Sequence, residues 1–211
     1  MICTESAITV SMPDLSFESQ LTGYVCGVDE AGRGPCAGPL CVAAVILDQD
    51  NIPEMIRDSK KLTEKQRFNI EPLIKQSALA WSVVEVSCEL IDCLNILQAT
   101  LWGMAEAVAR LPLKADHALI DGNRAPILGI PAQTIIKGDD RSLSIAAASI
   151  LAKTARDRIM IEMDSIYPAY GFKKHKGYQA KAHLEAISLH GPSPIHRRSW
   201  ATVRNLATTA Q

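Results

Sequence analysis

Apolar runs separated by short polar segments follow one another from about residue 24, and their lengths predict strands mixed with helices. The first two runs, YVCGVD and LCVAAVIL, have the length of strands, and the Gly-rich segment between them is short enough for a hairpin. Three more runs of strand length come later in the chain. The five expected strands cover residues 24–29, 40–47, 78–86, 117–121 and 133–138.

Two longer segments before the fourth strand are typical of helices. Thr63 and Gln66 form a capping box that opens a helix reaching about Lys75. A second helix is expected from Asn95, because apolar residues recur there at helical spacing on one face, namely Leu97, Leu101, Met104, Val108 and Leu111.

The C-terminal part of the chain predicts two further helices. Residues 142–163 form a long helix whose first half is apolar nearly all round, so we expect it to be deeply buried. A shorter helix is expected at about 179–189, before the loop GPSPIHRRSW. These elements predict an α/β protein with a mixed sheet in one domain, residues 22–206, after a flexible N-terminal tail, residues 1–21.

Charge is unevenly distributed, although the net charge of the 211 residues is only −1. The C-terminal segment, residues 171–211, holds seven Lys and Arg residues against one acid, so it carries +6 and the rest of the chain carries −7. An acidic body with a basic end favours a polyanionic partner. A solvated basic face would give the same distribution.

Composition argues against several other classes of protein. The six cysteines form no C-x-x-C pair and none is near a histidine, so a zinc site is not expected. Cysteines inside apolar runs suit the reducing cytoplasm. The longest apolar run, residues 40–47, is too short to span a bilayer, and the N-terminus lacks the pattern of a secretion signal. The sequence contains no serine elbow, Walker loop or kinase motif.

Carboxylates stand at the ends of predicted strands. Asp29, followed by Glu30, ends the first strand, Asp121 ends the fourth, and Asp139 and Asp140 precede the long helix. If the first and fourth strands are parallel neighbours, their terminal carboxylates emerge at one edge of the sheet. Several carboxylates in a small space need neutralisation, and Mg²⁺ or Mn²⁺ prefers such oxygen ligands. Taken singly, each acid could instead be a turn residue or a helix cap.

A glycine-rich loop follows the first acidic pair. Gly32, Arg33 and Gly34 belong to a formal G-x-G-x-x-A match, but a strand follows instead of a helix, so a dinucleotide site is not expected. The loop can offer backbone groups to a sugar or a phosphate. A plain tight hairpin is the alternative.

Two basic segments are candidates for nucleic-acid contact. Lys60 and Lys61 lie in a predicted loop that is fit for binding phosphate, and Tyr178 stands within the basic segment KKHKGY, where stacking can add to charge. The segment HRRSW repeats this combination with Trp200. A solvated lysine pair and a half-buried tyrosine are the alternatives.

The motifs together resemble the bacterial ribonuclease HII family. In order they are GVDEAGRGP, DSKKL, IDGN, KGD, AAASILAKTARD, YGFKKHKGY and GPSPIHRRSW, and they span about residues 22–204. The resemblance implies a ribonuclease H-like fold, with a five-stranded mixed sheet flanked by helices and additional C-terminal helices. It also implies hydrolysis of the RNA strand of RNA–DNA hybrids, and incision 5′ of ribonucleotides embedded in duplex DNA to leave 3′-hydroxyl and 5′-phosphate ends.

The same resemblance assigns roles to individual residues. It implies a two-metal mechanism, with Mg²⁺ or Mn²⁺ on four acids that are both catalytic and metal-binding, namely Asp29, Glu30, Asp121 and Asp139. At the fourth position Asp140 stands beside Asp139, and Asp157 in the long helix is a weaker rival. The implied substrate-binding residues are Gly32, Arg33, Gly34, Lys60, Lys61 and Tyr178.

The expected partners are RNA–DNA hybrids and ribonucleotide-containing duplex DNA, with no membrane and no obligatory protein partner, for a cytoplasmic monomer. Two other classes stay open at this point. One is a different nuclease of the same fold, such as a resolvase, and cleavage of an all-DNA duplex would favour it. The other is a non-catalytic nucleic-acid binding module, which metal-dependent turnover on a duplex with one ribonucleotide would exclude.

Overall fold

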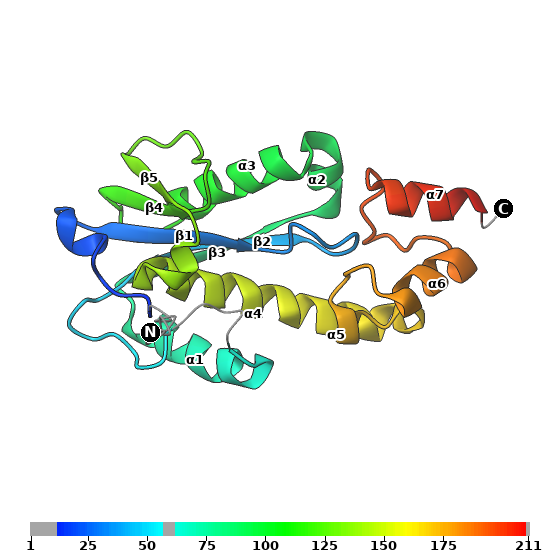
Figure 1. Cartoon of the computed structure of the whole chain (residues 1–211), viewed down its shortest axis with the longest axis horizontal. Helices are drawn as coiled ribbons and strands as arrows, with labels where there is room; N and C mark the ends of the chain where they lie inside the picture. The colour runs from blue at the N-terminus through cyan, green and yellow to red at the C-terminus, as the bar shows by residue number, and fades with distance from the viewer. Residues whose placement is uncertain (1–11, 57–61, 210–211) are drawn as a thin grey trace, which may run out of the picture.

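The computed structural model describes residues 12–56 and 62–209. Five strands form one mixed sheet in the order β3-β2-β1-β4-β5, with helices on both faces (Figure 1). The strands are β1 (Val25–Ala31), β2 (Leu40–Ile46), β3 (Ala80–Val86), β4 (His117–Asp121) and β5 (Ala132–Ile135). The α-helices are α1 (Glu64–Ser77), α2 (Cys88–Leu94), α3 (Ile96–Ala109), α4 (Leu143–Ile166), α5 (Phe172–His175), α6 (Lys181–His190) and α7 (Ala201–Thr209). The expected α/β fold with a mixed five-stranded sheet is confirmed.

Strand direction brings Asp29 and Asp121 together, although β1 continues two residues beyond Asp29, which was expected to end it. β1 runs antiparallel to β2 and parallel to β4, so the first two strands form the expected hairpin. Val28 of β1 pairs with Ile120 of β4, and the next residue of each strand is an aspartate. Asp29 and Asp121 therefore lie at the same edge of the sheet, as predicted.

Strand β2 is buried on both faces of the sheet, which explains its unbroken apolar sequence. Val42 and Ala44 pack in a cluster with side chains of α2 and α3, whereas Ala43 and Val45 pack with α1 and α4. In Figure 1 α3 lies above the sheet, and α4 with α1 lies below it. The sheet thus has a separate hydrophobic layer on each side.

The long helix α4 lies directly against the central strand. Its first half is buried without interruption from Ser144 to Ala152, as the apolar composition predicts. A Cβ on Gly27 of β1 would lie 2.1 Å from the carbonyl carbon of Ser144, so only glycine permits this approach. Ser142 caps the helix by accepting a hydrogen bond from the Ile145 N–H group, and neither preceding aspartate is the cap.

The face that α3 presents to the sheet differs from the prediction. Its buried residues are Ala99, Thr100, Gly103, Met104 and Ala107, whereas Leu97, Leu101 and Val108 are only partly buried. A Cβ on Gly103 would lie 2.8 Å from a methyl of Val42, so small residues let the helix approach the sheet closely. Met104 and Leu111 are buried as predicted, whereas Leu97, Leu101 and Val108 are only partly covered.

Part of the segment that was expected to be a flexible tail is packed instead. Glu18 is buried, and its carboxylate accepts hydrogen bonds from the Ser142 hydroxyl at 2.6 Å and the Ser144 N–H group at 3.0 Å. A carboxylate at the N-terminus of α4 satisfies helix N–H groups and interacts favourably with the helix dipole. Glu18 therefore packs against α4 within the segment that was expected to be a flexible tail, whose boundary at residue 22 stays a prediction. Residues 1–11 lie outside the described part.

The helices after α4 extend the molecule beyond the sheet, at the end of α4 (Figure 1). A third cluster joins them to the β1–β2 connection through the buried side chains of Cys36, Phe172, Ile187 and Val203. Within the described ranges, no helix combines the length and the apolar character that crossing a bilayer requires.

Candidate active site

A cavity of about 230 Å³ collects most of the predicted site residues. Asp29 and Glu30 of β1, Asp121 of β4 and Tyr178 after α5 line it together with the loop at 32–34. These residues come from three segments that are far apart in the sequence. The structure therefore brings seven of the predicted residues to one place.

Asp29 is the most buried of the acids that line the cavity, with 4% of the residue exposed. Its carboxylate accepts hydrogen bonds from the Glu30 N–H group at 2.7 Å and from the Ser149 hydroxyl on α4. Burial, and then the negative charges of Glu30 and Asp121, hold the pKa of Asp29 well above its usual value. A positive charge in the cavity would relieve this unfavourable environment.

Glu30 also lines the cavity, although successive strand positions point to opposite faces. The position lies almost at the end of β1, where the cavity opens along the edge of the sheet. Its carboxylate forms an ion pair with Arg33 at 3.3 Å, and the Arg33 side chain is about half exposed. The Glu30 side chain is only 11% exposed, so the pair faces solvent on its arginine side.

Asp121 is held by the turn that contains the predicted fourth acid. The Gly138 N–H group donates to the Asp121 carboxylate at 2.7 Å, within a short turn that continues through Asp139 and Asp140. Asp139 is buried and Asp140 is more exposed, but neither lines the cavity with the other acids. The structure thus groups three of the four predicted acids, and Asp139 lies in the turn whose Gly138 N–H group binds Asp121.

Two buried arginines fix the backbone of the glycine-rich loop. The guanidinium of Arg197 donates to the carbonyl oxygens of Gly32, Arg33 and Gly38, and that of Arg156 donates to the carbonyl oxygen of Pro39 at 2.9 Å. Both arginine side chains are buried. The loop is consequently held in shape from the protein side, which is the preorganisation that a binding site requires.

Gly32 and Gly34 differ in how well their positions would accept a side chain. Gly32 has a φ of +104°, and a Cβ there would lie 2.1 Å from Nε of Arg156. At Gly34 the nearest atom to an added Cβ is Cε1 of Tyr178 at 3.6 Å, an ordinary contact. Gly32 is therefore required by the fold, whereas Gly34 leaves room beside Tyr178 in the cavity.

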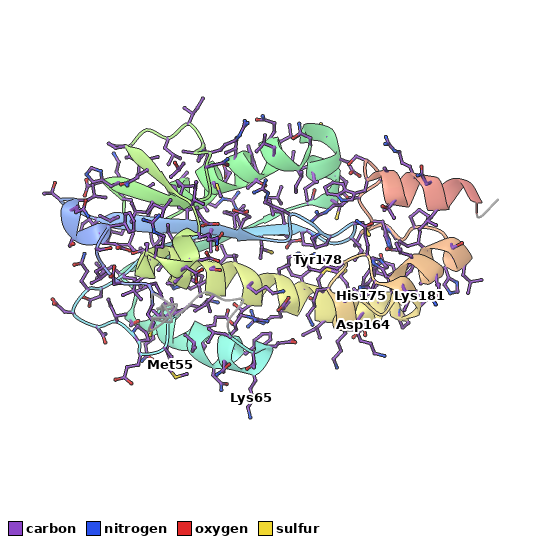
Figure 2. The ribbon with its side chains drawn as sticks, viewed as in Figure 1. Met55, Lys65, Asp164, His175, Tyr178 and Lys181 are labelled. Atoms are coloured by element: carbon purple, nitrogen blue, oxygen red, sulfur yellow. The ribbon has the colours of Figure 1, made fainter. Side chains whose placement is uncertain are left out.

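Tyr178 is docked against this loop by the residues around it. The Cys36 N–H group donates to the Gly177 carbonyl at 3.0 Å, and a Cβ on Gly177 would lie 2.2 Å from the Ala37 carbonyl oxygen. Half of Tyr178 is exposed, and Figure 2 shows it between the β1–β2 connection and α5. Its ring can therefore meet a ligand in the cavity.

A chain of buried hydrogen bonds supports the backbone of Tyr178. The Ser193 N–H group donates to Nδ1 of His196, so the proton of that ring is on Nε2, which donates to Nε2 of His183 at 3.0 Å. Nδ1 of His183 in turn donates to the Tyr178 carbonyl at 2.8 Å. Burial lowers the pKa of both rings, that of His196 to about 4, so both are neutral at pH 7.

The basic C-terminal segment is less exposed than its sequence suggests. Arg197 in HRRSW is fully buried, and burial lowers its pKa to about 10. Lys176 is also buried and forms an ion pair with Glu64 at 3.4 Å. The interpretation of these two cations as part of a nucleic-acid contact is therefore wrong, whereas Lys173 and Lys174 are exposed. Lys60 and Lys61 lie outside the described residues.

Sequence reasoning missed three residues of α4 that line the cavity, namely Ser149, Lys153 and Arg156. They recur at helical spacing and are polar side chains within a largely buried helix, which is the signal that could have located them. Burial lowers the pKa of Lys153, and its hydrogen bond to Asp157 counteracts that shift.

The donor set of the cavity suits a hard divalent cation. Its acidic side chains supply carboxylate oxygens only, and burial, followed by the charges of Glu30 and Asp121, raises the pKa of Asp29. Among the residues that the structure describes, no three His, Cys, Asp or Glu side chains already stand as the ligands of one ion would. The side chains fit a metal by chemistry and location, and coordination would draw them closer together.

Known proteins resemble this chain in sequence over most of its length. The family model described as "Ribonuclease HII" matches residues 26–203. A "Ribonuclease HII" of Dechloromonas aromatica is 55% identical over 181 residues, which are 86% of this chain and 92% of that protein.

Solved structures also match this chain over most of its length. The ribonuclease H2 of Pyrococcus horikoshii is 27% identical with a TM-score of 0.75, and the match covers 88% of this chain and 98% of that chain. The RNase HII in a PCNA complex from Archaeoglobus fulgidus is 28% identical with a TM-score of 0.74, covering 86% of this chain and 96% of that one.

Proposed function

Because the chain belongs to the ribonuclease HII family, it is an endonuclease of the ribonuclease H class, and we propose that it hydrolyses the RNA strand of RNA–DNA hybrids. We further propose that it incises duplex DNA on the 5′ side of an embedded ribonucleotide, leaving a 3′-hydroxyl and a 5′-phosphate. One observation carries the proposal: Asp29, Glu30 and Asp121 share a cavity with the glycine-rich loop and Tyr178.

Asp29, Glu30 and Asp121 would hold Mg²⁺ or Mn²⁺, and Asp139 is the proposed fourth ligand. Bound there, divalent ions supply activation of the attacking water and stabilisation of the departing 3′ oxygen. The carboxylates themselves contribute by their fixed positions, since Asp29 is held by Ser149 and Asp121 by the Gly138 N–H group. No nucleophilic side chain is needed for this chemistry.

The loop beside the acids would select ribose. A 2′-hydroxyl is the group that separates RNA from DNA at a given nucleotide, and it needs a close polar partner. The backbone at 32–34 is held by Arg197, and the space at Gly34 admits a sugar next to Tyr178. Stacking of a sugar or a base on the exposed ring would then set the position of the ribonucleotide.

The decisive test is cleavage of three duplexes of identical sequence. One is an RNA–DNA hybrid, one is DNA with a single ribonucleotide, and one is all DNA, each assayed with Mg²⁺, with Mn²⁺ and with EDTA. We expect metal-dependent cutting of the first two only, and the product 3′ end should be extended by a DNA polymerase. Equal cutting of the all-DNA duplex would support a resolvase-like nuclease instead.

We also propose that the protein works as a monomer in the cytoplasm without an obligatory protein partner. The cysteines of the described residues are all free thiols, which suits a reducing compartment. The complex with PCNA concerns the Archaeoglobus protein. Light scattering on the purified chain, combined with turnover by that chain alone, tests this part of the proposal.

A further inference from the structure

Lys153 occupies a distinct place among the cations that line the cavity. In the described part of the chain these are Arg33, Lys153 and Arg156. Arg33 is paired with Glu30, and Arg156 is buried and donates to backbone carbonyls. The Lys153 side chain is 27% exposed, and its hydrogen bond to Asp157, at 2.6 Å, uses one of the three N–H donors of an ammonium.

We propose that Lys153 binds a backbone phosphate of the nucleic acid in this cavity and that Asp157 is the positioning residue that aims it. The inference rests on the proposed function, because it assumes a polyanion beside the acids. A phosphate that enters a cavity with three carboxylates meets repulsion, which a fixed cation beside them offsets. Lys153 supplies that charge from α4, the element that also holds Asp29 through Ser149.

The carboxylate of Asp157 is fixed in position, so it can orient the side chain of Lys153. It is 1% exposed, and its second carboxylate oxygen accepts from Arg67 on α1 at 3.2 Å. Arg67 is itself fixed, because it donates to the Leu62 carbonyl at 2.6 Å. Because Arg67 fixes one oxygen of the buried Asp157 carboxylate, the position of the other oxygen is fixed too. That oxygen holds the Lys153 ammonium at the cavity wall. This arrangement gives Asp157 a role other than that of a fourth metal ligand.

The chain contains a nearly matched pair of residues that serves as a control. Lys75 and Glu71 of α1 are also four residues apart, with an Nζ–O distance of 2.6 Å and a lysine side chain that is 30% exposed. Glu71 is likewise buried and clamped by a second cation, Arg158. Lys75 does not line the cavity. Lys75 also lies 4.6 Å above the ring of Trp81, so the two lysines differ in that contact as well as in whether a ligand in the cavity could reach them.

The test compares Lys153→Met with Lys75→Met, using fluorescence anisotropy of a DNA duplex that carries one ribonucleotide. Binding is measured in EDTA over a series of salt concentrations, so the readout does not depend on turnover. We expect Lys153→Met to weaken binding about tenfold and to reduce the slope of log K against log salt by about 0.9, the loss of one phosphate contact. Lys75→Met should match the wild-type protein in both quantities.

Equal binding and equal salt slopes for the two variants would overturn the inference. Lys153→Arg keeps the charge and should recover most of the affinity, whereas a loss as large as that of Lys153→Met would mean a packing role. A wild-type protein that binds the duplex but cuts no ribonucleotide substrate would refute the proposed nuclease activity and leave this phosphate contact measurable.

The role of Asp157 is tested by a double-mutant cycle with Asp157→Asn, Lys153→Met and the double variant. If Asp157 aims Lys153, removing Lys153 from the Asp157→Asn protein should weaken binding clearly less than the tenfold loss in the wild-type protein. Thermal melting identifies a variant that fails to fold, and Asp157→Glu then serves as a second, charge-conserving change. Equal effects of Lys153→Met in both backgrounds would show that Asp157 only stabilises the α1–α4 contact.

Discussion

Asp29 of β1 and Asp121, the last residue of β4, lie level with each other in parallel neighbouring strands and line one cavity. Burial, and then the charges of Glu30 and Asp121, raise the pKa of Asp29. The metal-free site is therefore strained electrostatically, and the strain is greatest when all three acids are ionised. This relationship ties the proposed metal binding to measurable changes in both activity and stability.

Asp29→Asn removes one negative charge and one oxygen ligand from the cavity while keeping the size of the side chain. We expect kcat on a single-ribonucleotide duplex to fall at least about a thousandfold, because metal-assisted stabilisation of the transition state is worth several kcal/mol. Binding of an RNA–DNA hybrid should survive. The measurements are single-turnover cleavage and anisotropy on the same preparation, and turnover at the wild-type rate would refute the assignment.

Metal addition should stabilise the wild-type protein. At about 100 times its dissociation constant a ligand adds about 2.7 kcal/mol, which for a chain of this size corresponds to a rise in Tm of roughly 5–10 °C. The rise should be reversed by EDTA and should shrink in Asp29→Asn. Scanning calorimetry with Mg²⁺ and with Mn²⁺ measures it, and an equal rise in both proteins would place the metal elsewhere.

Gly34→Ala should change substrate choice without unfolding the protein. The added methyl meets only Cε1 of Tyr178 at 3.6 Å, but it narrows the space proposed for the ribose. We expect kcat/KM on the single-ribonucleotide duplex to fall about tenfold or more, while affinity for an all-DNA duplex changes less. Gly32→Ala is the contrasting variant, because its φ of +104° and the contact with Arg156 should lower Tm sharply.

Features with a local signal could be predicted from the sequence, and features set by long-range packing could not. Asp29 and Asp121 end apolar runs, so their convergence required only that the two strands be parallel neighbours. The Thr63 capping box is likewise encoded within four residues, and the structure contains it. The family resemblance added the roles of the glycine-rich loop and Tyr178, which the residues alone left open.

Arg197 and Lys153 show why the remaining features were missed. A cation looks the same in a sequence whether it is buried against carbonyl groups or lines a cavity, and the carbonyl groups that bind Arg197 are 159 to 165 residues away. From the sequence, Arg197 was therefore assigned to a basic surface, and Glu18 was assigned to a flexible tail. The buried face of α3 was misplaced for a related reason, since close packing on the sheet favours small side chains over the leucines that dominate the periodic pattern.

Tyr178→Ala should affect the two proposed substrates unequally. A single embedded ribonucleotide offers one sugar for recognition, so loss of the exposed ring should lower activity there further than on a long hybrid, which can bind in many registers. Base–aromatic stacking is worth about 1–3 kcal/mol, which corresponds to roughly a fivefold to hundredfold loss. Tyr178→Phe keeps the ring and should retain most activity, and kcat/KM on both substrates is the measurement.

Stability should decline in mildly acidic solution because of the buried histidine chain. His183 and His196 have lowered pKa values in the folded protein, that of His196 to about 4, against about 6.5 when unfolded. The unfolded chain therefore binds more protons below pH 6.5, so stability is complete above that pH and is lost as the pH falls toward 4. For His196 alone the loss is about 2 kcal/mol at pH 5.

Urea unfolding between pH 7.5 and 4.5 tests this prediction, and the Asp29→Asn background is the suitable host. Asp29 has a raised pKa, so its protonation stabilises the metal-free fold as the pH falls and would mask part of the histidine effect. In that background the free energy of unfolding should fall steadily below pH 6.5. Replacing the exposed His190 by Gln should leave the dependence of unfolding free energy on pH unchanged. His196→Gln should make that dependence weaker, because the chain of hydrogen bonds between the Ser193 N–H group and the Tyr178 carbonyl then contains one titrating ring fewer.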